Sequence, residues 1–179
     1  MTPRLPGDPV GKDLIERILR VDHAGEYGAR RIYEGQLSVL GKSACGPTLR
    51  HMAEQEAQHL KVFEKMVVER RARPTALLPF WHVAGYVLGA ATALLGEQAA
   101  MACTVAVEEV IDEHYRGQIA SLGEDEKPLG ETLEAFRQDE VAHRDTALAS
   151  GAEDAPGYAV LTQAVKGASR LAIWLSERI

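Results

Sequence analysis

The sequence predicts an all-α protein in which four helices form a bundle and two further helices are added to it. Three observations lead to this prediction. Sustained alternation of apolar and polar residues, which marks half-buried strands, does not occur in the sequence. Segments rich in proline, glycine and small polar residues divide the chain into stretches of helical length. A composition of 46% apolar and 26% charged residues is typical of a globular protein.

These helix-breaking segments set the expected order of elements. The helices are expected at residues 12–40, 47–72, 80–96, 97–121, 129–149 and 156–176. The segment 1–11, with three prolines, is expected to be a flexible tail. A length of 179 residues suffices for one well-buried domain, so residues 12–179 are expected to form a single domain.

The charge and the N-terminus narrow the function classes. A net charge of −6, with no basic stripe, excludes nucleic-acid binding as the main role. The N-terminal residues contain neither the apolar segment of a secretion signal nor an arginine- and serine-rich presequence. We therefore expect a bacterial cytoplasmic protein, or a eukaryotic chain written without its presequence.

The third expected helix is unusual because the segment from Pro74 to Gly96 has no Asp, Glu, Lys or Arg. A helix that is apolar on every side is either deeply buried or in contact with lipid. Pro79 shortens the usable helix to about 17 residues, the lower end of the transmembrane range. Three interpretations follow: a spanning helix, a buried core helix, or a helix that docks on a membrane surface. The last is favoured because Trp81 and Tyr86 suit the headgroup level.

The last expected helix carries a single apolar stripe. Its members are Leu161, Val165, Ala168, Ala172 and Leu175. Packing against a core explains such a stripe at least as well as a second membrane contact does.

The most informative feature is an internal repeat. Each half of the chain holds a glutamate and, thirty or thirty-two residues later, a Glu-x-x-His motif. The six residues are Glu26, Glu56, His59, Glu108, Glu140 and His143. The midpoints between the paired glutamates fall at positions 41 and 124, inside two expected turns, so each hairpin brings its three residues to one height. The i, i+3 spacing places Glu and His on one helix face.

The residue types of this repeat predict a metal site. Carboxylates and imidazoles without thiolates suit iron or manganese. Four buried carboxylates without cations would cost several kcal/mol each, whereas two divalent ions bring the site close to neutrality. A lone Glu-x-x-His is usually a solvated helix face, but two mirrored copies are not explained that way. We therefore predict a ferritin-like four-helix bundle with two iron ions held by these six residues.

Some neighbouring residues are ambiguous. Glu108 is followed by Glu109, about 100° further round the helix, and the loop length decides which of them is the ligand. Asp22, Asp139 and Asp145 are either hydrogen-bond partners of the histidines or solvated charges.

Two glycines stand inside the first helix beside the expected ligand Glu26. Gly25 and Gly28 each cost roughly 1 kcal/mol relative to alanine. A close approach of another backbone, or of a ligand, would account for them.

Four segments of the sequence carry a resemblance to a known family. They are RVDHAGEYGA at 20–29, Gln-Glu-x-x-His at 55–59, ACTVAVEE at 102–109 and AIWLSER at 172–178. From about Leu14 onward the chain resembles the demethoxyubiquinone hydroxylases of ubiquinone biosynthesis. The resemblance implies a membrane-associated di-iron monooxygenase that uses O2 to hydroxylate the ring of a polyprenyl demethoxyubiquinone or quinol. It selects Glu108 over Glu109, and it places His114 and Tyr115 near the substrate and the electron or proton route.

The resemblance also implies partners and a location. The substrate is a polyprenyl quinone, and the protein is expected peripherally on the cytoplasmic face of a bacterial inner membrane, or on the matrix face of the mitochondrial inner membrane. No nucleotide fingerprint is present in the sequence, so electrons come from outside: from a reductase, from NADH, or from the quinol itself. A homodimer and a lipid-binding partner protein are both compatible with the sequence.

The main alternative is a ferritin- or rubrerythrin-like protein that stores iron or detoxifies peroxide. Ferritin-type sites often lack the full twofold Glu-x-x-His set, and a soluble cage has no use for a charge-free helix. A rubrerythrin would usually bring a CxxC module, which this sequence lacks. A di-iron hydroxylase acting on a soluble or tRNA substrate is disfavoured by the acidic charge and the apolar helix.

Overall fold

The computed structural model of the chain describes residues 10–179; residues 1–9, most of the predicted tail, lie outside the described residues. Six α-helices account for most of residues 10–179, and no strand occurs among them, which confirms the predicted all-α fold. The helices are α1 (Gly11–Leu40), α2 (Gly46–Glu69), α3 (Leu78–Leu94), α4 (Glu97–Ser121), α5 (Lys127–Ala149) and α6 (Tyr158–Ser176). Two short 3₁₀ turns, η1 (Glu124–Glu126) and η2 (Ala152–Asp154), precede α5 and α6.

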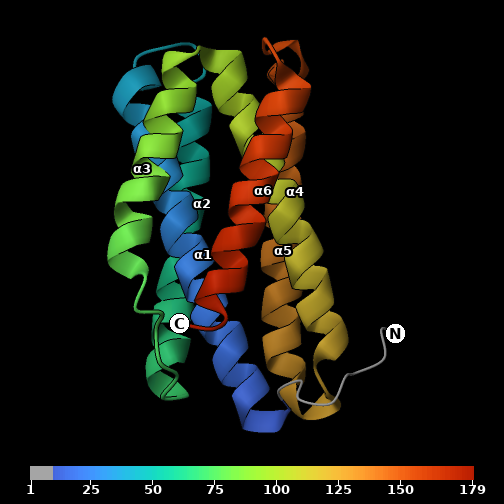
Figure 1. The fold of residues 1–179 in the computed structure, drawn as a ribbon. Helices are drawn as coiled ribbons and strands as arrows, with labels where there is room; N and C mark the ends of the chain where they lie inside the picture. Colours follow the sequence, from blue (N-terminus) through green and yellow to red (C-terminus); the bar gives the residue numbers. More distant parts are fainter. Residues whose placement is uncertain (1–9) are drawn as a thin grey trace.

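Two helical hairpins form the centre of the molecule. α1 packs against α2, and α4 packs against α5, as the mirrored spacing of the sequence predicts. The two additional helices are placed symmetrically, since α3 packs on α1 and α6 packs on α4. Figure 1 shows α3 and α6 side by side on the same side of the bundle.

Most helix boundaries agree with the sequence prediction, but α2 ends three residues earlier than expected, at Glu69 instead of residue 72. Residues Arg71 and Ala72 donate backbone hydrogen bonds to the carbonyl oxygens of Val68 and Val67, at 3.2 and 2.9 Å. This is the bond pattern of a Schellman motif, in which the residue after the cap is left-handed. Here that residue is Arg71, at φ 53°, instead of the usual glycine. The residue types therefore do not mark the last residue of α2, which lies several positions before Pro74.

Glycines bring α3 unusually close to α1. A Cβ atom added at Gly35 would collide with the backbone of α3, and one added at Gly89 would collide with the carbonyl oxygen of Ile32 in α1. At Gly85 an added Cβ would lie 2.9 Å from the carbonyl oxygen of Gly28. The contact between the two helices is thus made backbone to backbone, and we call Gly35, Gly85 and Gly89 the α1–α3 glycine contact.

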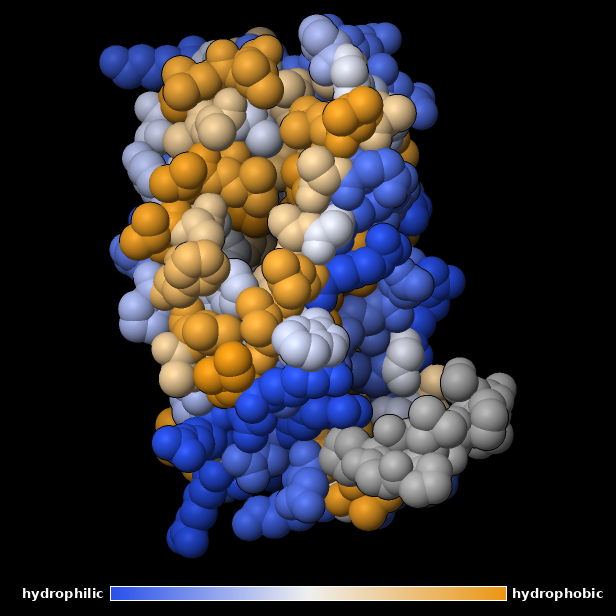
Figure 2. Space-filling view, in the orientation of Figure 1, coloured by the Kyte–Doolittle hydropathy of each residue, from blue (hydrophilic) through white to orange (hydrophobic). Residues whose placement is uncertain are grey.

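The charge-free helix α3 is not a buried core helix, so that interpretation of its sequence is wrong. Its glycines face α1, but Phe80, Val83 and Val87 are each more than half exposed. On α6, Leu171 and Trp174 are exposed as well. Figure 2 shows apolar side chains gathered where α3 and α6 lie in Figure 1, above a band of hydrophilic residues. Across residues 10–179, every helix falls short of the length and apolarity that crossing a membrane requires.

The α1–α3 glycine contact can be tested with Gly89→Ala. Because the new methyl group overlaps the Ile32 carbonyl oxygen, the helices must separate, and we expect the free energy of unfolding to fall by about 1–3 kcal/mol. Denaturant titration followed by circular dichroism measures this change. The matched control is Gly167→Ala in α6, where nothing lies within 4 Å of an added Cβ. The control should gain up to about 1 kcal/mol from helix propensity, and a loss of equal size in both variants would contradict the contact.

Candidate metal centre

The six residues of the sequence repeat converge on one layer of the bundle. α1 contributes Glu26 and α4 contributes Glu108, while α2 and α5 each contribute a Glu-x-x-His pair. All six residues are buried, none more than 3% exposed. The structure therefore brings together every residue that the mirrored spacing predicts.

Apolar clusters lie above and below this layer. One contains Tyr33, Leu49 and Met52 together with the first turns of α4. The other contains Leu19 and Phe63 together with residues from the start of α1 and α5. The polar layer is thus sealed from solvent along the bundle axis, where unneutralised charge is strongly disfavoured.

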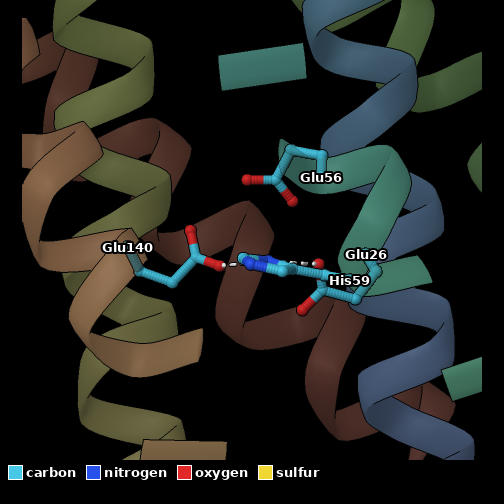
Figure 3. Close-up of side chains that lie close together, drawn as sticks. All are labelled: Glu26, Glu56, His59 and Glu140. Atoms are coloured by element: carbon cyan, nitrogen blue, oxygen red, sulfur yellow. Dashed lines mark ion pairs between the residues drawn. The ribbon is translucent and has the colours of Figure 1, made fainter. Parts of the chain in front are cut away.

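The ligand atoms fall into two groups that share two carboxylates. Glu26, Glu56, His59 and Glu140 form one group; Glu56, Glu108, Glu140 and His143 form the other. Within each group the candidate ligand atoms all lie within 4.8 Å of one another. Figure 3 shows the first group, with side chains from α1, α2 and α5 pointing toward a common centre. Since Glu56 and Glu140 belong to both groups, the geometry could hold two adjacent cations that share these two residues.

Both histidines present Nδ1 to the carboxylates. His59 Nδ1 lies 3.3 Å from Glu140 and 3.5 Å from Glu26, and His143 Nδ1 lies 3.2 Å from Glu56. The other ring nitrogen of each histidine, Nε2, lies within hydrogen-bond distance of a side-chain oxygen on its far side. His59 Nε2 is 3.1 Å from Asp139 Oδ2, and the ring stacks on Phe136 with centroids 4.0 Å apart.

The partner behind His143 is Gln55, whose Oε1 lies 3.1 Å from Nε2. An outer partner of this kind fixes the ring orientation of a metal-binding histidine. Of the aspartates considered from the sequence, Asp139 takes this role, whereas Asp145 pairs with Arg144 on the surface. Gln55 was missed, although its position directly before Glu56, one turn from His59, was visible in the sequence.

The electrostatics of the layer disfavour unneutralised carboxylates. Burial, followed by the charge of Glu140, raises the pKa of Glu56 and of Glu108 well above the ordinary value for a glutamate. Burial also raises the pKa of Glu140. For His59, burial lowers the pKa, but the neighbouring carboxylates of Glu140 and Glu26 outweigh it and bring the pKa to about 10. The carboxylates therefore favour any positive charge placed among them.

The unpaired atoms of the site test whether a metal fits. Among the described residues, several buried side-chain atoms have no hydrogen-bond partner, and most of them belong to this layer. They are Glu26 Oε2, Glu56 Oε1, His59 Nδ1, Glu108 Oε2, both carboxylate oxygens of Glu140 and His143 Nδ1. Unsatisfied buried polar atoms are rare in native proteins and call for an explanation. Coordination of two divalent cations would satisfy them, so the donor set fits a metal centre.

The structure separates Glu108 from its neighbour. Glu108 accepts a hydrogen bond of 2.9 Å from the hydroxyl of Tyr33 inside the bundle. Glu109 lies on another face of α4 and forms an ion pair with Lys166 of α6. The choice that the residues alone left open is thus decided by helix rotation.

His114 and Tyr115 lie beside the layer but in different surroundings. The Tyr115 hydroxyl is buried and donates a short hydrogen bond to Glu26. His114 is half-buried at the edge of the bundle, where its Nε2 lies 2.9 Å from Gln118 Nε2. Gln118 in turn donates a 2.7 Å hydrogen bond to the buried Asp22. Asp22 therefore faces His114 instead of a histidine of the metal layer.

An all-α bundle with a buried layer of four carboxylates and two imidazoles has the donor set that carboxylate-bridged two-metal proteins use. The sequence comparisons place the chain in one family. The family described as "Ubiquinone biosynthesis protein COQ7" matches residues 13–176, so this chain belongs to that family.

Relatives of known description extend over nearly the whole chain. A protein of Rhodospirillum rubrum, named 3-demethoxyubiquinol 3-hydroxylase, is 59% identical over 98% of this chain and 84% of its own length. The human protein named NADPH-dependent 3-demethoxyubiquinone 3-hydroxylase, mitochondrial, is 49% identical over 96% of this chain and 81% of its own length. The Saccharomyces cerevisiae protein named 5-demethoxyubiquinone hydroxylase, mitochondrial, is 41% identical over 92% of this chain and 78% of its own length.

Because Glu56 belongs to both groups, replacing it should disturb both cation positions. We expect the parent chain to bind two metal ions after anaerobic loading with ferrous iron, and Glu56→Gln to bind fewer than one. Metal content per chain, measured by mass spectrometry after desalting, checks this. The matched control is Glu109→Gln, which removes a carboxylate that faces Lys166 and should leave two ions bound. If both variants bound the same amount of metal, Glu56 would not be a ligand.

Proposed function

We propose that this chain is a membrane-associated di-iron monooxygenase that uses O2 to hydroxylate the ring of a polyprenyl demethoxyubiquinone or quinol in ubiquinone biosynthesis. The observation that carries the proposal is the pair of four-residue groups that share Glu56 and Glu140 in the sealed centre of the bundle. Membership of the family supports the reaction assigned, since its relatives are named for this hydroxylation.

In this proposal the six layer residues are the ligands of two iron ions. Carboxylate and imidazole donors without thiolate suit iron, and two shared carboxylates keep the ions adjacent. Bound iron would supply the activation of O2 and the electron transfer that hydroxylation needs. The protein supplies orientation and exclusion of water: Asp139 and Gln55 hold the histidine rings, and the apolar clusters close the layer above and below.

An apolar cavity beside the layer provides the place for the quinone. It has a volume of about 280 Å³ and lies between α1, α3, α4 and α6. Val107 and Ile111 line it from α4, adjacent to and one turn away from Glu108, and Ala29 lines it from α1, one turn after Glu26. The cavity therefore adjoins the segments of α1 and α4 that carry two of the proposed ligands, Glu26 and Glu108.

The exposed apolar face of α3 and α6 explains how a polyprenyl substrate enters. The tail of such a quinone resides in the bilayer, so the enzyme must touch lipid where its cavity opens. Trp81, which lines the cavity, sits at this face and donates a 3.0 Å hydrogen bond to Ser176. We assign this face to peripheral contact with a membrane, on the cytoplasmic side of the inner membrane if the source is bacterial. The human and yeast relatives are named as mitochondrial.

His114 and Tyr115 are the proposed route for protons and electrons. Tyr115 donates a hydrogen bond directly to Glu26, and His114 lines an open, partly polar cavity of about 400 Å³ at the surface. Tyr115 holds a proton next to a proposed iron ligand, since burial raises the pKa of its hydroxyl well above the ordinary value. The electrons come from an external reductant, NADH or a related donor; the human relative is named as NADPH-dependent.

A ferritin- or rubrerythrin-like role is the alternative, and two features weigh against it. Iron storage and peroxide removal need neither an apolar cavity next to the metal layer nor an exposed apolar face. Homodimerisation through α3 and α6, or capture of this face by a lipid-binding partner, is compatible with the proposed reaction.

Isotope labelling tests the reaction itself. A monooxygenase places one atom of O2 in its product and reduces the other to water, with two electrons from the reductant. Iron-loaded protein supplied with ¹⁸O2, a reductant and a decyl-tailed demethoxyubiquinol should therefore yield a ring-hydroxylated product with one ¹⁸O, detected by mass spectrometry. Glu56→Gln should yield none. Oxygen taken from water, or ferric iron that accumulates without product, would favour the alternative role.

Membrane contact can be tested on α3 alone. Val83 and Val87 lie one turn apart on its exposed side, at 59% and 56% exposure. The double change Val83→Asp and Val87→Asp should lower binding to phosphatidylcholine–phosphatidylglycerol vesicles at least about tenfold, because two valines no longer enter the interface. Flotation measures the bound fraction. Val68→Asp, the same apolar-to-acidic change at an exposed valine of α2, should have no effect, and parallel losses would contradict the assignment.

A further inference from the structure

The glycines inside α1 are of two kinds. Gly35 is required by the close approach of α3, because an added Cβ would overlap the α3 backbone. Gly25 and Gly28 are different: nothing lies within 4 Å of a Cβ built at either position. Helix packing therefore does not account for them, although a glycine inside a helix costs roughly 1 kcal/mol relative to alanine.

Both of these glycines line the apolar cavity. They lie three residues apart, on the side of α1 that faces the cavity, and Gly25 directly precedes the proposed ligand Glu26. Across the cavity, α6 also presents small side chains, at Ala168, Ser169 and Ala172. The space left free by the missing side chains is thus part of the cavity volume, at its wall nearest Glu26.

We propose that Gly25 and Gly28 determine substrate specificity by forming the seat of the quinone ring, so that a flat, substituted ring rests directly on the backbone of α1. This inference rests on the proposed function and adds the residues that shape the site. A methyl group at either position would project into the space that the ring occupies. Bare backbone on one side and small side chains on the other leave a slot suited to a planar ring.

The proposal predicts opposite effects on stability and on binding. Gly25→Ala and Gly28→Ala should each raise the melting temperature by about 2–4 °C, because alanine favours the helix and meets no atom. The same variants should weaken binding of a decyl-tailed demethoxyubiquinone at least about tenfold, as expected when one methyl group intrudes into a fitted pocket. A residue needed only for folding would lower stability and binding together.

Binding is measured with the full-length chain in detergent by quenching of Trp81 fluorescence. Trp174→Phe is made in every sample, so that Trp81, which lines the cavity, is the one reporter of the chain's two tryptophans. The control is Gly167→Ala, another glycine inside a helix with nothing within 4 Å of an added Cβ, but outside the cavity lining. It should show the gain in melting temperature with unchanged quinone affinity.

The outcomes separate the two proposals. Weaker binding in both cavity variants, with stability raised and metal content unchanged, supports the seat. Parent-like affinity in Gly25→Ala and Gly28→Ala, or a fall in their melting temperature, overturns it while leaving the hydroxylase function in place. Failure of the parent chain to bind the quinone, with iron bound, would overturn the proposed function and the seat with it.

Discussion

Four carboxylates buried at the centre of a helical bundle are the constraint around which this chain is organised. Without cations they repel one another in a medium that solvates charge poorly. Burial, followed by the charge of Glu140, raises the pKa of Glu56 and of Glu108 well above the ordinary value. The fold keeps them there by placing apolar clusters on both sides of the layer and fixing each histidine from behind. Such an arrangement costs stability in the metal-free protein, which supports the proposal that the layer serves to bind metal.

Much of this site could be predicted from the sequence because helical geometry links spacing to position. The mirrored separation of Glu26 from Glu56, and of Glu108 from Glu140, needed only two short turns to bring all six residues to one height, and those turns lie where breakers marked them. Helix ends that carry no glycine or proline were harder to predict. The left-handed Arg71 ends α2 through backbone hydrogen bonds that leave no trace in residue types.

Contacts between helices that are distant in the sequence were beyond prediction. Spacing alone did not decide between Glu108 and Glu109, since the answer depends on Lys166 and Tyr33 from other helices. Gln55 behind His143, and Asp22 beside Gln118, follow from how the two hairpins meet. The side of α3 that faces α1 could not be predicted either, because a helix without charged residues has no polar face that indicates its orientation. Gly85 and Gly89 identify that side only once α1 is known to pack against it.

The division of ligands between the hairpins has a consequence for how the protein is assembled. The first hairpin carries Glu26, Glu56 and His59, and the second carries the other three, yet each metal-binding group draws on both. Neither hairpin can complete either group alone, so each ion bound in the proposed centre would act as a cross-link between the two halves of the chain. Metal loading would thereby become a checkpoint of assembly, because both groups are complete only after residue 143 has been synthesised and the halves have docked.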